Sequence, residues 1–375
     1  MIPSRGMTPI DVSSFDIHVA MLGARRGYAV PGILSRAGRM GRFYTDFYAG
    51  NKPWLIALAG LKGLSWMPGL LRRALTRSMA DIDPRRVTAY DLIGLHHAFA
   101  RRIVHWRSDP MSVDLHTASA FGRRVATDGL VGARIVYAFN GAALEVFERA
   151  RTLGVTCVLD QTLAPWSVQR AILREEVLRW PGWEPKLPAA QASDAVMESR
   201  EGAEWRLAHR ILSPSQFVGG ALHACGVSPK KVRNVPFGVD PSRFQFAMRP
   251  LASGELRILC VGSVCLRKGI PYLLEAAKRL GSHRVKVRLV GPISIPMRYL
   301  REYRPWVEWI GAIPRPQVVE EYQRADVLVL PSLCEGSAGV TYEALAAGLP
   351  VITTPNAGSV VRDGVDGAIV AIRDS

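Results

Sequence analysis

Short apolar runs alternate with segments of helical periodicity along most of the chain. This alternation predicts parallel β-sheets whose strands are connected by helices. In the N-terminal half the predicted strands are Asp16–Leu22, Arg134–Phe139, Val155–Leu159 and Arg210–Leu212, and the pattern over residues 40–125 is too weak to assign. In the C-terminal half they are Leu256–Val261, Val285–Val290, Trp306–Ile310, Asp326–Leu330 and Val351–Thr353. The hydrophobic pattern therefore predicts an α/β fold.

The length of 375 residues favours two domains with separate cores, because one domain typically has roughly 100–200 residues. The best boundary begins near Asn234, in a segment with prolines and glycines but without apolar periodicity. We therefore expect an N-terminal domain over residues 1–235, a linker over 236–255 and a C-terminal domain over 256–375. Two Rossmann-like domains joined in this way place a ligand in a cleft that faces the carboxyl ends of both sheets.

The formal net charge of +16 is concentrated near the N-terminus. Residues 1–110 contain 14 Arg and 2 Lys against 7 Asp and no Glu, so 16 positive and 7 negative charges leave +9. A positive field attracts polyanions and anionic lipid headgroups, although free use of Arg in a GC-rich genome explains the same excess. No nucleic-acid recognition motif accompanies the charge, so nucleic acid is not an expected partner.

The apolar segment Trp54–Leu71 comes nearest to a membrane helix, but Lys62, Pro68 and several glycines interrupt it. A spanning helix needs roughly 20 predominantly apolar residues. Three arginines follow the segment before residue 78. The pattern is compatible with an interfacial helix at an anionic membrane surface and equally with a helix of the core.

The cysteines bear on the cellular compartment. They are five, an odd number, and lack C-x-x-C spacing, which indicates reduced thiols in a cytosolic protein. The first residues, Met1 to Asp16, lack the apolar stretch of a secretory signal. We therefore expect a cytoplasmic protein that can also sit peripherally at the inner face of the cell membrane.

The strongest local signal is the segment Asp326–Pro355, which contains an apolar strand, a short polar loop and a helix predicted over Val340–Ala347. A strand followed by small residues and a helix start presents backbone N–H groups and a positive dipole end, which suit a phosphate or a sugar hydroxyl. The carboxylates of Glu335 and Glu343 can face the same ligand and accept its hydroxyl hydrogen bonds. Two other interpretations are a general acid/base pair, or a helix cap at Glu335 with a solvated Glu343.

This segment resembles the E-x7-E motif of glycosyltransferase family 4. The shared elements are Pro331-Ser332, Glu335-Gly336, Glu343-Ala344 and Gly348–Ile352. Further similarity lies in Leu256–Ala277, Ala208–Phe217, Asn234–Phe244, Val307–Gly311 and Tyr322–Val327, so that the resemblance covers residues 205–373. It implies the GT-B architecture and a retaining transfer of sugar from a nucleoside diphosphate sugar, the co-substrate, without a metal or other cofactor.

The resemblance also implies roles for individual residues of the donor site. Lys268 is expected to neutralise the diphosphate, Glu343 to bind the ribose hydroxyls and Glu335 to hold hydroxyls of the transferred sugar. The backbone that meets sugar and phosphate is expected at Gly262, Ser263, Gly336, Ser337, Ala338, Gly339, Val340 and Thr341. Many relatives carry Gly-Arg where this chain has Gly262-Ser263. Arg267 either substitutes for the missing cation or is an exposed loop charge.

The acceptor side is less defined. Relatives often place a histidine after a strand that resembles Arg134–Phe139, and this chain has Asn140 there. His116 and Asp160 are the other candidates for a catalytic group, and no catalytic base is assigned. The residues Gly23, Arg25 and Arg26 follow the first strand as the acceptor loop of the family does, and the arginines are suited to an acceptor phosphate.

The end of the chain differs from the family pattern. Relatives usually continue for further helices, the last of which returns to the N-terminal domain, whereas this sequence stops at Ser375. We therefore expect a C-terminal domain that is incomplete relative to the family. The expected activity is glycosyl transfer to a saccharide or lipid-linked acceptor in cell-surface polysaccharide or glycolipid biosynthesis. The alternative is a non-catalytic sugar-nucleotide-binding or scaffold protein with the same fold.

Overall fold

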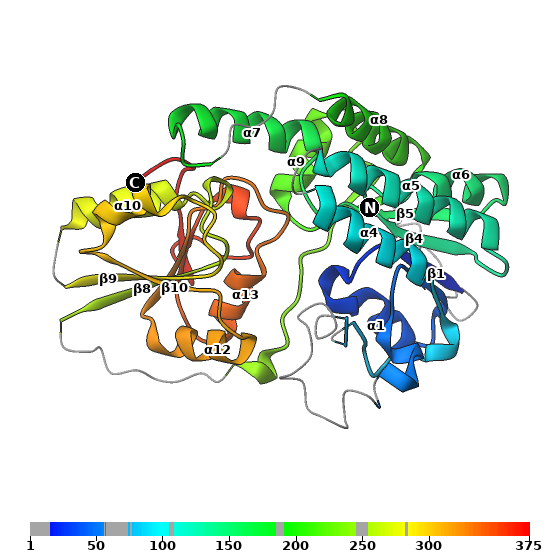
Figure 1. Ribbon diagram of the computed structural model, residues 1–375, viewed down its shortest axis with the longest axis horizontal. Coiled ribbons are helices and arrows are strands. Elements are labelled where there is room, and N and C mark those ends of the chain that lie inside the picture. The colour runs from blue at the N-terminus through cyan, green and yellow to red at the C-terminus, as the bar shows by residue number, and fades with distance from the viewer. Residues whose placement is uncertain are drawn as a thin grey trace, which may run out of the picture. The chain divides into compact units, whose positions relative to one another are not determined.

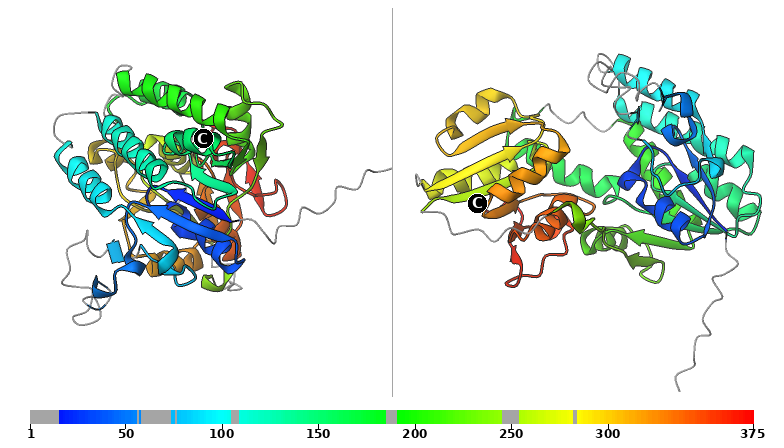
Figure 2. Two further views of the ribbon diagram at one scale, coloured as in Figure 1. Left: turned by 90° about the vertical axis from the view of Figure 1, so that its right-hand side faces the viewer. Right: turned by 90° about the horizontal axis from the view of Figure 1, so that it is seen from below.

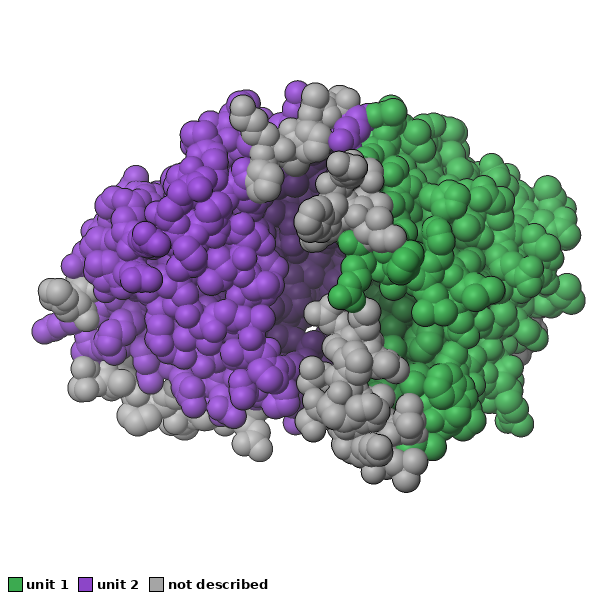
Figure 3. Space-filling view, viewed as in Figure 1, with its two compact units in different colours: residues 1–160, 192–211 green, residues 161–191, 212–375 purple. Residues whose placement is uncertain are grey.

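The computed structural model describes residues 16–55, 57, 74–75, 77–104, 109–184, 191–244, 254–281 and 284–375. The chain divides into two compact units, residues 1–160 with 192–211, and residues 161–191 with 212–375 (Figure 3). The expected linker over 236–255 lies partly, and the apolar segment Trp54–Leu71 largely, outside the described residues. The domain boundaries expected from the sequence stay predictions.

The first sheet has seven strands in the order β3-β2-β1-β4-β5-β6-β7, and the pairs from β3 to β5 are parallel. Its strands are β1 (Ile17–Met21), β2 (Met40–Thr45), β3 (Val87–Ala89), β4 (Ile135–Phe139), β5 (Thr156–Asp160), β6 (Arg210–Ser213) and β7 (Val232–Asn234). The helices of this half of the chain are α1 (Ala29–Arg36), α4 (Asp91–Val104), α5 (Pro110–Asp128), α6 (Leu144–Thr152), α7 (Trp166–Arg179), α8 (Ala192–Leu207) and α9 (Gln216–Ala224).

The second sheet has six parallel strands in the order β10-β9-β8-β11-β12-β13. Its strands are β8 (Leu256–Val261), β9 (Val285–Val290), β10 (Val307–Gly311), β11 (Val327–Leu330), β12 (Val351–Thr353) and β13 (Gly367–Ile369). The helices that connect them are α10 (Ile270–Leu280), α11 (Met297–Leu300), α12 (Arg315–Arg324) and α13 (Gly339–Ala346). Two sheets of parallel strands with connecting helices confirm the predicted α/β class.

Side chains of β8 alternate between two cores, one on each face of the second sheet. Ile258 and Cys260 belong to the core that includes α10, whereas Leu259 and Val261 belong to the core that includes Tyr322 of α12. Figure 1 shows α10 and α12 on opposite faces of the sheet. Because successive strand residues point to opposite faces, a continuous apolar run is what a strand covered on both faces requires.

The sequence pattern missed β2 and β3, which lie in the region that it left unassigned. In β2 the last three residues, Phe43 to Thr45, are all buried, but Arg42 before them is exposed and Gly41 has no side chain. Their pattern is therefore neither an alternation nor an uninterrupted apolar run. Strand β3 has only three residues, too few to show a period.

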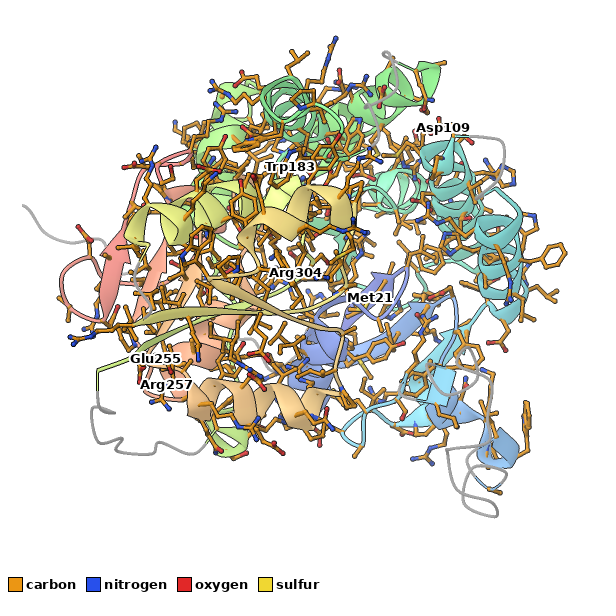
Figure 4. All side chains as sticks on the ribbon, turned by 60° about the vertical axis from the view of Figure 1, so that its left-hand side comes forward. Met21, Asp109, Trp183, Glu255, Arg257 and Arg304 are labelled. Atoms are coloured by element: carbon orange, nitrogen blue, oxygen red, sulfur yellow. The ribbon has the colours of Figure 1, made fainter. Side chains whose placement is uncertain are left out.

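The segment 161–184 belongs to the second unit although it precedes β6 in the sequence. Its residue Trp183, labelled in Figure 4, is 7% exposed and lies in the core beside α10. The Trp183 ring stacks on that of Tyr299, with 5.7 Å between centroids. On α7, the buried carboxylate of Glu176 accepts hydrogen bonds from Tyr272 of α10 and from Arg373. This segment is thus an integral part of the second unit.

None of the helices among the described residues is both long enough and apolar enough to span a membrane.

Candidate functional site

The order of strands in the second sheet reverses between β8 and β11. From β8 the chain proceeds outward to β9 and β10 and then returns to β11 on the other side of β8. Ligands of open parallel sheets bind outside the carboxyl ends of the strands at such a reversal. The predicted residues Gly262 to Lys268 follow β8, and Glu335 to Glu343 follow β11. The two groups therefore begin at the same edge of the sheet.

The loop after β8 is held close to the loop after β11. It contains a single 3-10 turn, Leu266–Lys268, which ends at Gly269 with φ of 68°. A Cβ atom at Gly269 would lie 1.9 Å from the carbonyl oxygen of Pro331. Only glycine fits there, because both the left-handed backbone and the close approach exclude a side chain.

The charged groups of the two loops meet at Glu335. Its carboxylate pairs with the Lys268 ammonium at 2.8 Å and with the Arg267 guanidinium. Arg267 also donates to the carbonyl oxygen of Cys334 at 3.0 Å. The side chains of Lys268 and Glu335 are each 11% exposed, whereas that of Arg267 is 32% exposed. Arg267 is therefore bound into this cluster and is not an isolated loop charge.

The backbone after Glu335 is fixed by three segments of the second unit. A Cβ atom at Gly336 would lie 1.8 Å from the carbonyl oxygen of Thr162. The Gly336 carbonyl accepts a hydrogen bond of 2.6 Å from the Ser215 hydroxyl, and the Ser337 hydroxyl donates to the carbonyl of Gly358 at 2.9 Å. The glycine at 336 is thus required by packing, in addition to any ligand that approaches it.

Helix α13 begins with backbone N–H groups that its own turns do not satisfy. Its N-cap residue, Ala338, provides no side-chain hydrogen bond to the helix, so Glu335 is not its cap. The Thr341 hydroxyl donates to the Ala338 carbonyl at 2.7 Å. The N–H groups of Gly339 and Val340 lie in the first turn of the helix, at the positive end of its dipole. The helix begins one residue before its predicted start and ends one residue before its predicted end.

Glu343 lies in the second turn of α13. Its carboxylate accepts hydrogen bonds from the Tyr322 hydroxyl at 2.9 Å and from Arg315 at 2.6 Å. Its side chain is 16% exposed, so it is not a solvated surface charge. Burial, and then the neighbouring Glu343 carboxylate, raise the pKa of Tyr322, which keeps the phenol protonated as a donor.

The part of the chain that contains this geometry matches a known family. The profile described as "Glycosyl transferases group 1" matches residues 255–375. Residues 255–375 are therefore similar to the group 1 glycosyltransferases. This match agrees with the resemblance drawn from the E-x7-E segment.

Individual curated proteins are similar to this chain over part of their length. The putative colanic acid biosynthesis glycosyltransferase WcaL of Salmonella typhimurium is 28% identical over 180 residues, 44% of each chain. The D-inositol 3-phosphate glycosyltransferase of Geodermatophilus obscurus is 33% identical over 174 residues, 40% of this chain and 39% of the relative. The match thus spans less than half the length of these curated relatives.

A solved structure supports the fold over nearly the whole chain. The Anabaena protein Alr3699/HepE, in complex with UDP and glucose, is similar with a TM-score of 0.58. The similarity covers 96% of this chain and 86% of that protein at 14% sequence identity. The chain therefore has the GT-B fold, with two Rossmann-like sheets.

Unit 1 has a strand-order reversal of its own, between β1 and β4. Asn140 follows β4, and its carbonyl accepts a long hydrogen bond of 3.5 Å from Arg25. Arg26 pairs with Asp160 at the end of β5 at 2.7 Å, and Tyr137 donates to the other oxygen of Asp160 at 2.6 Å. Burial raises the pKa of Asp160, and the Arg26 guanidinium opposes that shift.

The loop after β1 has an unusual backbone. Arg26, Gly27 and Tyr28 have φ values of 52°, 58° and 64°, a left-handed conformation that non-glycine residues rarely adopt and that is often found at functional sites. The N–H of Gly23 donates to the Asp46 carboxylate at 2.8 Å. The structure thus brings the acceptor-side residues Gly23, Arg25 and Arg26 to the same sheet edge as Asn140 and Asp160.

The remaining catalytic candidate, His116, lies elsewhere in unit 1. It is on the exposed side of α5, with its ring 6.1 Å from that of His96 on α4. Within the described ranges no cluster of three or more His, Cys, Asp or Glu side chains is arranged to hold a metal ion.

Sequence reasoning missed residues that hold these loops in place. Asp46 pairs with Arg77 at 2.9 Å and anchors the Gly23 loop. Although burial alone would raise the pKa of Asp46, hydrogen bonds from Arg77 and the Gly23 N–H lower it. Glu184 accepts a hydrogen bond of 2.7 Å from the Leu266 N–H, at the start of the turn that carries Lys268. No local motif surrounds these residues, because each acts on a loop that is distant in sequence.

Proposed function

We propose that this chain transfers a sugar from a nucleoside diphosphate sugar to an acceptor hydroxyl, with retention of the anomeric configuration and without a metal ion. The bond between the anomeric carbon and the diphosphate breaks, and a bond from that carbon to the acceptor oxygen forms. The nucleoside diphosphate leaves with the bonding electron pair, and the acceptor hydroxyl releases its proton. We further propose that cell-surface polysaccharide or glycolipid biosynthesis uses this reaction.

The observation that carries the proposal is the pairing of Lys268 with Glu335 where the strand order reverses. A diphosphate gains negative charge as the sugar departs, so a fixed cation stabilises the transition state more than the bound substrate. Lys268 and Arg267 supply this positive charge. The Glu335 carboxylate beside them is suited to accept hydrogen bonds from hydroxyls of the transferred sugar.

The start of α13 supports the donor assignment. Backbone N–H groups at Gly339 and Val340 are suited to phosphate oxygens. Glu343, already oriented by Tyr322 and Arg315, is suited to the two hydroxyls of a ribose. In this proposal the chain's own donors and helix dipole provide the electrostatic stabilisation that a divalent ion provides in other transferases.

The relatives and the N-terminal unit support a saccharide or lipid-linked acceptor. WcaL is described as a colanic acid biosynthesis enzyme, which favours a saccharide acceptor at the cell surface. Arg25 and Arg26 lie at the sheet edge of unit 1 beside Asn140, and we propose that this edge receives the acceptor. UDP and glucose bound to the Anabaena protein make UDP-glucose the first donor to examine.

The test is a calorimetric titration with a panel of nucleoside diphosphate sugars, followed by assays of transfer and hydrolysis. Lys268→Ala and Glu343→Ala are each expected to weaken donor binding by about 1–3 kcal/mol, which is the loss of a charged hydrogen bond. Lys278→Ala is the matched control, because Lys278 is a half-exposed cation on α10 that pairs loosely with Glu302 at 3.9 Å.

Equal weakening by the control and by Lys268→Ala would mean that general charge attracts the donor and that no specific site exists. Donor binding without transfer or hydrolysis, across a panel of saccharide and lipid-linked acceptors, would favour a sugar-nucleotide-binding protein over an enzyme.

A further inference from the structure

Helix α4 presents a row of large apolar side chains to solvent. Leu92 is 82% exposed, Leu95 is 63% exposed and Phe99 is 66% exposed. A single exposed leucine on a protein surface is ordinary, but three in a row on one helix form a contiguous apolar surface. A surface helix normally places polar residues outward, so this outward row of apolar side chains on α4 is unusual.

The spacing puts these residues on one face of the helix. Positions 92, 95 and 99, together with His96 and Arg102, fall within one third of the helix circumference at 100° per residue. The opposite side packs onto the protein. A Cβ atom at Gly94 would lie 2.9 Å from the Asp46 carbonyl oxygen, and α4 runs beside α5 (Figure 1 and Figure 2). The outward face, here called the α4 ridge, comprises Leu92, Leu95, His96, Phe99 and Arg102.

Positive charge accompanies the ridge. Arg101 and Arg102 are both exposed near the end of α4, and the ridge itself contains no Asp or Glu. The acidic groups nearby are already paired, since Asp91 pairs with Lys52 at 2.9 Å and Asp114 of α5 pairs with Arg101 at 3.7 Å. The ridge therefore combines apolar side chains with a cation, Arg102, that pairs with no carboxylate among the described residues.

A further exposed aromatic residue lies close to the first turn of α4. Trp54 is 65% exposed and is only two residues from Lys52, whose ammonium pairs with Asp91 at the start of the helix. Tryptophan is favoured at membrane–water interfaces because its ring is amphipathic. Trp54 is thus a further exposed apolar residue near the N-terminal end of α4.

We propose that the α4 ridge is a membrane-docking surface that inserts Leu92, Leu95 and Phe99 into the interfacial layer of a bilayer rich in anionic lipid. Interfacial helices bind through shallow burial of apolar side chains together with attraction between basic residues and anionic headgroups. The charge of +9 over residues 1–110 complements such a surface and opposes pairing with a second copy of the same positive face. The ridge belongs to unit 1, so this inference does not depend on the proposed transfer reaction.

The experiment measures binding of the full chain to sedimented vesicles of phosphatidylcholine, alone or mixed with phosphatidylglycerol. Leu95→Asn with Phe99→Asn is expected to lower the partition coefficient on mixed vesicles at least about tenfold, because buried apolar area is lost. Arg102→Gln is expected to lower it roughly fivefold on mixed vesicles only. Leu178→Asn is the matched control, because Leu178 is an 81% exposed leucine on α7 of the second unit.

Unchanged sedimentation of the Leu95 and Phe99 variant, or equal loss in the Leu178 control, overturns the proposal. A change from dimer to monomer in the ridge variant, measured by analytical ultracentrifugation without lipid, also overturns it and assigns the ridge to a second copy. Binding of a nucleoside diphosphate by the same variants is measured in parallel. Retained nucleotide binding with lost vesicle binding confirms that the donor site and the ridge act separately.

Discussion

Replacing Glu184 by alanine removes a hydrogen bond that orders the turn carrying Arg267 and Lys268. The Leu266 N–H donates to the Glu184 carboxylate at 2.7 Å, and Leu266 is fully buried. The N-cap residue of the turn, Cys265, provides no side-chain hydrogen bond. Glu184 therefore acts as the cap of a turn more than eighty positions away in the sequence.

The structure sets the size of the expected effect. A hydrogen bond to a charged acceptor contributes about 1.5–3 kcal/mol, whereas a neutral one contributes about 0.5–1.5 kcal/mol. Glu184→Ala leaves the buried Leu266 N–H without this acceptor, so we expect a loss of about 1–3 kcal/mol in the free energy of unfolding. If donor binding must restore the order of the turn, the Kd for a nucleoside diphosphate rises by up to roughly a hundredfold.

Glu184→Gln separates positioning from charge. Glutamine keeps a side-chain carbonyl as acceptor, so the Kd of this variant for a nucleoside diphosphate is expected to stay within about tenfold of the value for the unsubstituted protein. The assay is calorimetric titration with a nucleoside diphosphate, accompanied by urea unfolding of each variant. Tyr303→Phe, which removes a hydrogen bond to Glu275 on α10, is the control for a general loss of stability.

The reasoning is refuted if Glu184→Ala binds the nucleotide as tightly as the unsubstituted protein. It is also refuted if Tyr303→Phe weakens nucleotide binding as much as Glu184→Ala at an equal loss of stability. Either result would mean that the contact with Leu266 supports the fold without positioning Lys268.

Two further predictions concern buried contacts. Gly336→Ala is expected to lower the free energy of unfolding by several kcal/mol in urea titrations, because its Cβ would lie 1.8 Å from the Thr162 carbonyl oxygen. Gly339→Ala is the control, because there is open space around Gly339. Equal stability of the two variants would contradict the prediction. Burial raises the pKa of Glu204 to about 7 from an ordinary value of 4.5, so the folded protein binds more protons than the unfolded chain between these pH values. The free energy of unfolding is therefore expected to fall as the pH rises through that window, by roughly 3 kcal/mol. Glu204→Gln is expected to remove this pH dependence of the free energy of unfolding. The same pH dependence in the variant and in the unsubstituted protein would contradict the prediction.

The sequence alone determined the α/β class and the residues of the candidate donor site. In the C-terminal half every predicted strand is present, because strands covered on both faces appear as continuous apolar runs. The segment from Glu335 to Glu343 was recognised because a strand end, small residues and a helix start are local signals. Each of them is expressed within a few positions of the chain.

Only the tertiary structure decided which of these residues meet and what holds them. Glu335 joins Lys268 and Arg267 across more than sixty positions, and Glu184 and Thr162 support the same loops from a segment that precedes the second sheet in sequence. The α4 ridge was hidden for a related reason. Helix α4 lies in the region where the hydrophobic pattern was too weak to assign an element, and only the packing of Gly94 against Asp46 shows which side of the helix faces outward. Contacts between residues that are distant in sequence depend on the order of the strands and the orientation of the helices, which the whole core determines. Such contacts therefore produce no local pattern in the sequence.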